Sequence, residues 1–539
     1  MALRRYTASA DTTIVNAYKP SLRLRGTGAN AGAADVLEAF SIYGRQTTSS
    51  QELSRILIKF PVTDISADRT AGTIPASGSV SFYLRMFNAQ HSKTVPRDYK
   101  MMAIAVSRSW QEGTGLDIEG YKDVTNDQTG SNWINAASGT QWDMVGGDYR
   151  TGSSDASDAN KNPIYTQTMT TGLEDVEIDI TALVELWMAS TVSNNGMGVF
   201  FTASYEAYAS GSASLPASTP ERPYLDSSSV VHNPEGSKAS YYTKRFFARG
   251  SQYFFKRPVI EARWNSVRRD DRGEFYFSSS LATGDDNRNT LFLYNYIRGR
   301  LQNIPAVGTG KISVSLYSGS SDNSVPSGSK LKLSITDDGY DGGVKSATDT
   351  NATGGWYKTG IYTCSMALTS SSQDYAPTTV YDVWHSSSTQ YFTSSADSNR
   401  FAGHADVRDP VYYLNITNLR NKYYTNERKV RFNLYVRNKN WSPTIYTKAS
   451  DSAPSTSIIS ASYRVYRTLD GYEAVAHGTG SNFHTGISYD VSGNYFDMDM
   501  KLLEPGYAYA LRFAFYDSEL SSWVEQNETF KFRVEDYEY

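Results

Sequence analysis

The chain has 539 residues, which exceeds the length at which one hydrophobic core usually divides, so we expect two to four domains. Its 40 tyrosines, with abundant Ser, Thr and Gly and few long apolar runs, favour strands and turns and predict an all-β protein. A formal net charge of −4 without any basic block argues against nucleic acid as the partner.

Targeting signals and the number of cysteines indicate the cellular compartment in which the chain is made. Residues 1–18 include basic side chains but no apolar stretch of signal-peptide length, and no later run is long enough to span a membrane. We therefore expect a chain made in a cytoplasm, with no membrane partner. The single cysteine, Cys364, excludes an intramolecular disulfide and a cysteine-based zinc site, and its surroundings predict a small buried side chain in a strand.

Alternating apolar and polar residues predict strands along the first half of the chain. The predicted strand segments are residues 10–26, 52–65, 78–89, 100–110, 175–180 and 197–201. Between the last two, residues 182–188 predict a short helix, which the Thr181 hydroxyl would cap. Residues 209–238 are heavy in Ser, Ala, Pro and Gly and predict a long surface loop, and residues 245–264 predict two closing strands.

The rest of the chain repeats the alternation in two groups. The segments of the first group are residues 289–301, 310–320, 329–339, 355–366 and 378–386. Those of the second are residues 410–419, 428–439, 461–469, 507–516 and 528–537. Strands at this spacing predict two β-sandwiches of immunoglobulin size, over residues 266–405 and 406–539, with a boundary at about 394–410.

Residues 109–149 place Trp110, Trp133 and Trp142 among Gly, Asp, Asn, Ser and Thr, with almost no strand or helix periodicity. One interpretation is a ligand-binding loop whose exposed aromatic rings stack on a sugar. The other is an ordered surface loop whose aromatic side chains pack against a β-sandwich. We favour this packing role.

The order of short motifs in the first 264 residues resembles the DNRLRE-type domain, a β-sandwich related to some carbohydrate-binding modules. The matching segments are residues 10–12, 55–61, 110–113, 129–133, 142–148, 180–187, 195–199, 247–249 and 257–264. The resemblance implies a jelly-roll-like β-sandwich over residues 1–265 and places all three tryptophans at regular positions of that fold. Long insertions after Trp110 and after Phe201 depart from the family pattern.

Two further resemblances concern the rest of the chain. The whole chain, including residues 275–305, is similar in style to virion structural proteins of contractile-tailed phages that infect marine cyanobacteria. Residues 502–513 resemble the corner of fibronectin type III domains, with Leu503, Pro505, Gly506 and Tyr509 in place. In that family the tyrosine hydroxyl ties a strand to the preceding turn.

Catalytic and metal-binding patterns are sparse. The sequence has no G-x-S-x-G elbow, no Walker-type phosphate loop and no H-E-x-x-H pair, so we expect no enzyme and no cofactor. A glycosidase carboxylate pair stays open, because only the fold sets its geometry. Acidic turns could offer oxygen ligands to calcium, although ordinary turn formation explains them better. These turns contain Asp155, Asp158, Asn160, Asp285, Asp286, Asn287, Asp337, Asp338 and Asp341.

Residues 241–256 hold more aromatic side chains than one sandwich face needs, and such residues favour protein interfaces. The predicted assembly surface comprises Tyr241, Tyr242, Phe246, Phe247, Tyr253, Phe254 and Phe255; a well-packed closing hairpin is the alternative. We expect a non-enzymatic structural component of a tailed-phage virion, associated with tail, neck or baseplate, that forms homo-oligomers and binds other virion proteins. The alternative is a carbohydrate-binding adhesin of the particle, with glycan contacts at Trp110, Trp133 and Trp142.

Overall fold

The contacts in the computed structural model divide the chain into two compact units. The N-terminal unit comprises residues 2–265 with 479–485, and the C-terminal unit comprises residues 266–478 with 486–539. The residues that the structure describes are 2–19, 25–43, 51–90, 95–116, 130–150, 164–209, 230–278, 287–319, 326, 328–333, 350–368, 379–399, 411–439, 445, 455–480 and 483–537. The further division at residues 405/406 falls outside these residues and stays a prediction.

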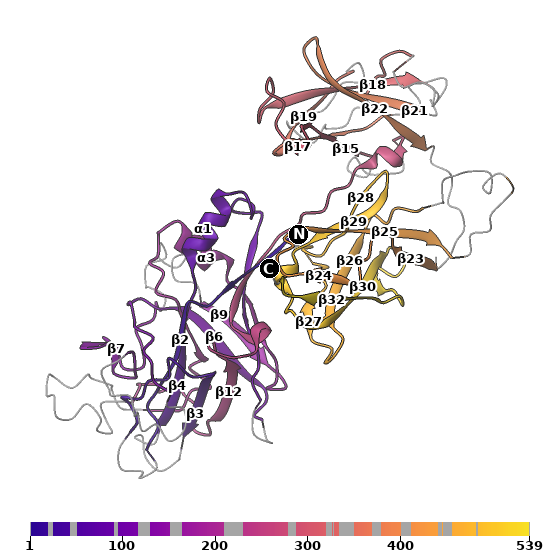
Figure 1. Cartoon of the computed structure of the whole chain (residues 1–539). Helices are drawn as coiled ribbons and strands as arrows, with labels where there is room; N and C mark the ends of the chain where they lie inside the picture. The colour runs from indigo at the N-terminus through magenta and orange to yellow at the C-terminus, as the bar shows by residue number, and fades with distance from the viewer. Residues whose placement is uncertain are drawn as a thin grey trace. The chain divides into compact units, whose positions relative to one another are not determined.

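Both units are built from β-sheets, as the composition predicts, and the fold class is all-β (Figure 1). The strands of the N-terminal unit are β1 (Leu3–Thr7), β2 (Ala10–Val15), β3 (Val36–Tyr43), β4 (Gln51–Lys59), β5 (Ser81–Met86), β6 (Tyr99–Ala105), β7 (Asn135–Ala137), β8 (Thr140–Gln141), β9 (Ile164–Met169), β10 (Val176–Asp179), β11 (Met197–Phe201), β12 (Tyr241–Phe247) and β13 (Val259–Arg263).

Two sheets form the sandwich of the N-terminal unit. One has four strands in the order β1-β13-β5-β10, and the other runs β12-β3-β4-β11-β6-β9, with β2 also paired to β4. Apolar side chains from both sheets, among them Ile56, Phe82, Leu84 and Met101, are buried in one core. The sequence reading missed β3, because its run of five consecutive buried residues lacks the alternation that marks a strand with one exposed face.

The two closing strands are present, but the alternative that they form a hairpin is wrong. β12 lies at the end of the seven-stranded sheet beside β3, whereas β13 lies inside the four-stranded sheet between β1 and β5. Residues 248–258 therefore cross from one sheet to the other, and include a 3-10 turn at Phe254–Lys256. Pro258 stands directly before β13, as predicted, where its missing N–H costs no ladder hydrogen bond.

Two helices lie together at one end of this unit in Figure 1: α1 (Val62–Thr70) and α3 (Thr181–Met188). Residues 62–65, predicted as the end of a strand segment, instead begin α1 directly after Pro61. The predicted capping role of Thr181 is wrong, because its hydroxyl accepts a hydrogen bond from the Phe82 backbone N–H at 2.8 Å. That contact joins α3 to β5. At the start of the helix, the Asp179 carboxylate accepts the Thr181 N–H at 2.9 Å.

The C-terminal unit consists of further sheets. Its strands are β14 (Phe275–Tyr276), β15 (Asn289–Tyr294), β16 (Tyr296–Ile297), β17 (Arg300–Leu301), β18 (Lys311–Gly319), β19 (Ala352–Lys358), β20 (Ile361–Met366), β21 (Thr379–Ser386), β22 (Thr389–Asn399), β23 (Tyr412–Ile416), β24 (Lys422–Tyr424), β25 (Val430–Asn438), β26 (Ala461–Arg467), β27 (Glu473–Val475), β28 (Ser488–Asp490), β29 (Gly493–Met498), β30 (Ala508–Asp517), β31 (Ser522–Glu525) and β32 (Phe530–Glu535).

The first sheet of this unit, β14-β22-β21-β18-β19-β20-β15, folds back on itself. The Asn289 side chain on β15 hydrogen-bonds both the N–H and the carbonyl of Tyr276 on β14, each at 2.8 Å, so the two end strands are joined. Cys364 is buried inside this sheet's core, as predicted. Residues 355–366 form a hairpin rather than one strand, because Gly360 turns the chain with φ of +72°.

Residues 411–537 carry two sheets with an aromatic core between them. The orders are β23-β25-β29-β28 and β24-β32-β30-β26-β27, with β31 on β30. Phe496 of the first sheet stacks on Tyr463 of the second, with ring centroids 4.2 Å apart. The Tyr509 hydroxyl donates to the Glu504 carbonyl at 2.9 Å, which is the contact that the fibronectin resemblance implies. Within the described residues, no helix is both long and apolar enough to cross a membrane.

Candidate assembly surface

β12 is an end strand of the seven-stranded sheet, and among the described residues half of its outer edge has no backbone partner. The outer edge of its C-terminal half is covered, because Arg245 and Phe247 exchange backbone hydrogen bonds with Ala89 and Phe87, each 3.0 Å long. Backbone groups alternate in direction along a strand, so the N–H and carbonyl groups of Tyr241 and Thr243 also point outward. Among the described residues, these groups have no backbone partner.

Exposed apolar side chains flank this open edge. Tyr241 is 65% exposed and its ring lies 5.1 Å from that of Tyr242, nearly parallel to it. Ile42 on β3 is the direct partner of Tyr241, so the two side chains lie on the same face of the sheet. Ile42 is 44% exposed. We call Ile42, Tyr241, Tyr242 and Thr243 the open edge. Ile42 was not predicted as part of a surface, since its strand was not recognised.

The seven aromatic residues predicted as one assembly surface do not lie together on the exterior. Phe246 is fully buried and Phe255 is nearly so, at 6% exposure, which corrects their assignment to the surface. Tyr253 and Phe254 are exposed, and Tyr253 packs edge-on against Phe247 beyond the covered end of β12. Only Tyr241 and Tyr242 of the predicted set belong to the open edge.

The three predicted glycan-contacting tryptophans are used for packing. Trp133 and Trp142 are both fully buried, and the Trp142 indole N–H donates to the Asn132 carbonyl at 2.9 Å. Trp110 is partly buried, and its indole N–H donates to the Asn195 carbonyl at 2.7 Å. Because a sugar stacks on an exposed ring face, Trp133 and Trp142 offer it no such contact.

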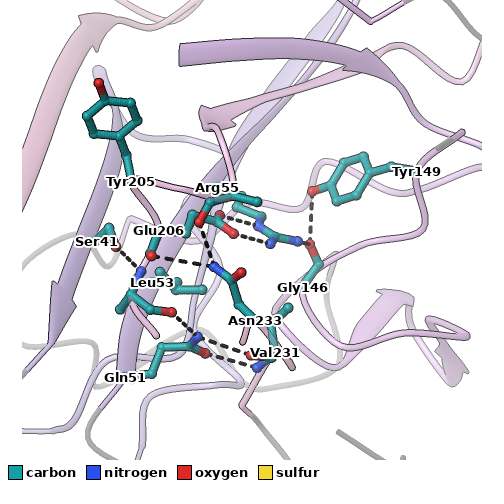
Figure 2. A network of polar contacts seen from close by, with 12 residues as sticks. Ser41, Gln51, Leu53, Arg55, Gly146, Tyr149, Tyr205, Glu206, Val231 and Asn233 are labelled. Atoms are coloured by element: carbon teal, nitrogen blue, oxygen red, sulfur yellow. Dashed lines mark hydrogen bonds and ion pairs between the residues drawn. The ribbon is translucent and has the colours of Figure 1, made fainter. Parts of the chain in front are cut away.

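A buried polar network joins β4 to described residues that flank the long insertions (Figure 2). Arg55 on β4 makes a bidentate ion pair with Glu206, with N···O distances of 2.9 and 2.8 Å, and donates to the Gly146 carbonyl at 3.2 Å. Its guanidinium carbon lies 5.7 Å from the centre of the Trp133 ring. A side chain at Gly146, where φ is +83°, would meet that ring at 2.9 Å, so glycine at this position allows the close packing.

Neighbouring contacts extend the network to two more segments. The Gln51 amide pairs with both backbone groups of Val231, at 2.9 and 3.1 Å. The Asn233 amide donates to the Ala203 carbonyl at 2.8 Å. The network thus holds the chain on either side of the long Ser-rich insertion, as Figure 2 shows for Val231 and Asn233 beside β4.

A second polar cluster joins three of the short motifs found in the sequence. The Asp11 carboxylate accepts the Arg249 N–H at 2.6 Å, and the Glu112 carboxylate accepts both the Asp11 N–H, at 2.8 Å, and the Arg249 guanidinium, at 2.7 Å. Burial, followed by the charge of Glu112, raises the pKa of Asp11 to about 7, although the Arg249 N–H opposes this. The cluster therefore holds three segments that are distant in the sequence against one another.

The next question is whether the described residues include a cluster of metal-ligating side chains. No group of three or more His, Cys, Asp or Glu side chains could hold a metal ion there. Of the acidic turns considered as calcium sites, Asp155, Asp158, Asn160, Asp285, Asp286, Asp337, Asp338 and Asp341 lie outside the described residues. Burial lowers the pKa of both His477 and His484 to about 4, so both rings are neutral at pH 7.

Comparisons with known proteins add no identification. No family model matches the chain, and no curated protein sequence matches it. Among solved structures, E. coli alpha-2-macroglobulin in its native conformation aligns at 9% identity with a TM-score of 0.15, over 89% of this chain. The chain spans about a fifth of that protein's length, 21%. DIP-gamma IG1+IG2 aligns at 9% identity with a TM-score of 0.11, over 51% of this chain and 97% of that one.

Proposed function

We propose that this chain is a non-enzymatic structural component of a tailed-phage virion, associated with its tail, neck or baseplate, and that it acts by protein–protein assembly. The observation that carries the assembly role is the open edge, where outward backbone groups at Tyr241 and Thr243 adjoin the exposed Tyr241 and Ile42 side chains. The particle is proposed from the resemblance of the sequence to virion structural proteins.

An open strand edge is a template for pairing with another chain, and folded proteins usually protect it with charges or proline. The open edge lacks this protection. Lys244 points inward, where its ammonium group donates to Asn88 and to the Gly172 carbonyl at 2.7 and 2.9 Å, and Arg245 pairs with Glu38. The exposed tyrosine adds contact area of the kind that protein interfaces favour.

We further propose that the partner at this edge is a second copy of the chain. Residues 240–243 are uncharged, so two copies can pair antiparallel without like charges opposing each other. The adhesin alternative, in contrast, was predicted from three tryptophans, two of which have no exposed face. The burial of Trp133 and Trp142 supports the assembly proposal over glycan contact at these two residues.

The test is the association state of the purified full chain, measured by sedimentation over a concentration series. Tyr241→Asp places a charge on the open edge, and Thr243→Pro removes an outward N–H without removing a hydrogen bond to β3. We expect the wild-type chain to self-associate and both variants to stay monomeric. Ile164→Asp is the matched control, because Ile164 is 46% exposed on β9 at the opposite end of the same sheet.

A wild-type chain that stays monomeric, or variants that associate as it does, would overturn self-assembly through this edge. The virion role has its own measurement, quantitative mass spectrometry of purified particles that carry the gene. We expect the chain in a fixed ratio to a symmetric capsid or tail protein. Its absence from the particle would refute the virion role whatever the sedimentation result.

A further inference from the structure

The C-terminal unit contains a cavity of about 460 Å³ that none of the preceding observations uses. This volume lies in the range of small-molecule sites. Its lining comes from several elements: Arg268 precedes β14, Tyr294 ends β15, Lys358 ends β19, Arg431 belongs to β25 and Tyr495 to β29. No local sequence pattern marks this site, because its lining residues are scattered over more than 200 positions.

Hydrogen bonds fix the segment that carries Arg268 to the elements around it. The Arg268 N–H donates to the Ser488 hydroxyl, and the Arg268 carbonyl accepts the Tyr489 N–H, each at 3.0 Å. Three residues on, the Asp271 carboxylate accepts the Tyr489 hydroxyl and the Thr290 N–H, each at 2.6 Å. Hydrogen bonds to β15 and β28 therefore hold the segment 268–271 in place beside the cavity.

Positive charge dominates this cavity. Four cationic side chains line it, Arg268, Lys358, Lys429 and Arg431, against the single lining carboxylate of Asp490. Asp497, which lies behind the lining, pairs with Arg431 at 3.0 Å and lies 3.6 Å from Lys429.

Two of the cations have no anionic partner. In the part of the chain that the structure describes, no carboxylate lies within 4.0 Å of the charged groups of Arg268 or Lys358. Partial desolvation, together with the charges of Arg268 and Lys429, lowers the pKa of Lys358. These two side chains therefore supply positive charge that a bound anion would neutralise.

Polar aromatic groups complete the lining. The Arg431 guanidinium lies 4.2 Å from the centre of the Tyr495 ring, which holds its plane in place. Tyr296 is 61% exposed and offers a ring face, and Thr359 adds a hydroxyl group. Aromatic rings and hydroxyl groups beside the two cations Arg268 and Lys358 suit a small ring-shaped ligand that has hydroxyl groups and one anionic group.

We propose that this cavity binds a small polyhydroxylated anion, a monosaccharide-sized ring that bears a carboxylate or a phosphate group. Arg268 and Lys358 contact the anionic group, while Tyr296 and Thr359 contact the ring and its hydroxyls. This site is independent of the open edge of the N-terminal unit.

The test is calorimetric titration of the full chain with glucuronate, glucose 6-phosphate, glucose and inorganic phosphate. We expect saturable binding of glucuronate or glucose 6-phosphate that weakens with added salt, and none of glucose; which of the two binds tells carboxylate from phosphate. Lys358→Gln and Arg268→Gln should each weaken binding about tenfold or more. Arg437→Gln is the matched control, because Arg437 is also on β25 and lies over a tyrosine ring, that of Tyr413, but does not line the cavity.

Three results would overturn the proposal. The first is the absence of saturable binding by either ring-bearing anion. The second is binding that Lys358→Gln leaves unchanged, since Lys358 is exposed and its replacement does not disturb the core. The third is equal affinity for inorganic phosphate and glucose 6-phosphate, which would show that the ring makes no contact.

Discussion

The guanidinium of Arg55 and the carboxylate of Glu206 form a two-pronged ion pair in the interior of the N-terminal unit. Their side chains are 7% and 5% exposed, and the residues are 151 positions apart in the chain. Burial opposes the charge of Arg55, but the Glu206 carboxylate raises the pKa of Arg55 above its ordinary value. This pair anchors the residues before the Ser-rich insertion to the central strand β4.

We predict that Arg55→Met destabilises the N-terminal unit by about 3 to 5 kcal/mol, because it leaves the Glu206 carboxylate buried without its partner. The double variant Arg55→Met, Glu206→Leu should recover most of this loss, since no charge then stays in the core. Urea unfolding of the full chain measures both. Arg4→Met is the control, because its ion pair with Asp68 is 31% and 19% exposed and should contribute little.

A second prediction concerns the pH dependence of the free energy of unfolding. The Asp11 carboxyl has a pKa of about 7 in the folded chain against an ordinary value of 3.8, so unfolding releases a proton between these pH values. Rising pH therefore favours unfolding, and the Asp11 contribution is lost between about pH 4 and pH 7.

Asp11→Asn removes this titration. The variant should match the wild-type chain near pH 4 and exceed its stability at pH 8 by on the order of 4 kcal/mol. Urea unfolding at a series of pH values provides the measurement, with exposed Asp35→Asn as the control. A constant difference between the wild-type chain and Asp11→Asn across this range would contradict the prediction.

The corner at Tyr509 predicts a stability loss in the C-terminal unit. Tyr509→Phe removes the donor to the Glu504 carbonyl and keeps the buried ring, so we expect a loss of about 1 to 2 kcal/mol. Thermal unfolding of the full chain measures it. An unchanged transition of the C-terminal unit would show that the corner hydrogen bond adds nothing to its stability.

The opposite result is expected at Tyr99. Its ring is fully buried, and its hydroxyl has no hydrogen-bond partner among the described residues. Tyr99→Phe should therefore stabilise the N-terminal unit by about 1 kcal/mol, because an unpaired polar group leaves the core. A measured loss of stability would show that the hydroxyl has a partner, such as a bound water.

Local sequence patterns were most informative where one residue property repeats along an element. The alternation in residues 430–438 shows directly in β25, where buried and exposed positions follow one another. The patterns failed where contacts between distant segments decide which residues are buried. β3 is buried on both faces and was missed, and Phe246 and Phe255 were assigned to a surface although the crossing between sheets buries them.

By itself the sequence indicated the all-β class and the buried position of Cys364 in a strand, and it favoured packing over ligand contact for Trp133 and Trp142. These features depend on residues that are close together in the sequence, so a local pattern is enough to indicate them. Only the tertiary structure decided that Arg55 meets Glu206, that the outer edge of β12 at Tyr241 and Thr243 has no backbone partner among the described residues, and that Arg268 and Lys358 line one cavity. Each of these relationships joins distant residues, and the pairing order of strands, which no local pattern encodes, sets the distance between them.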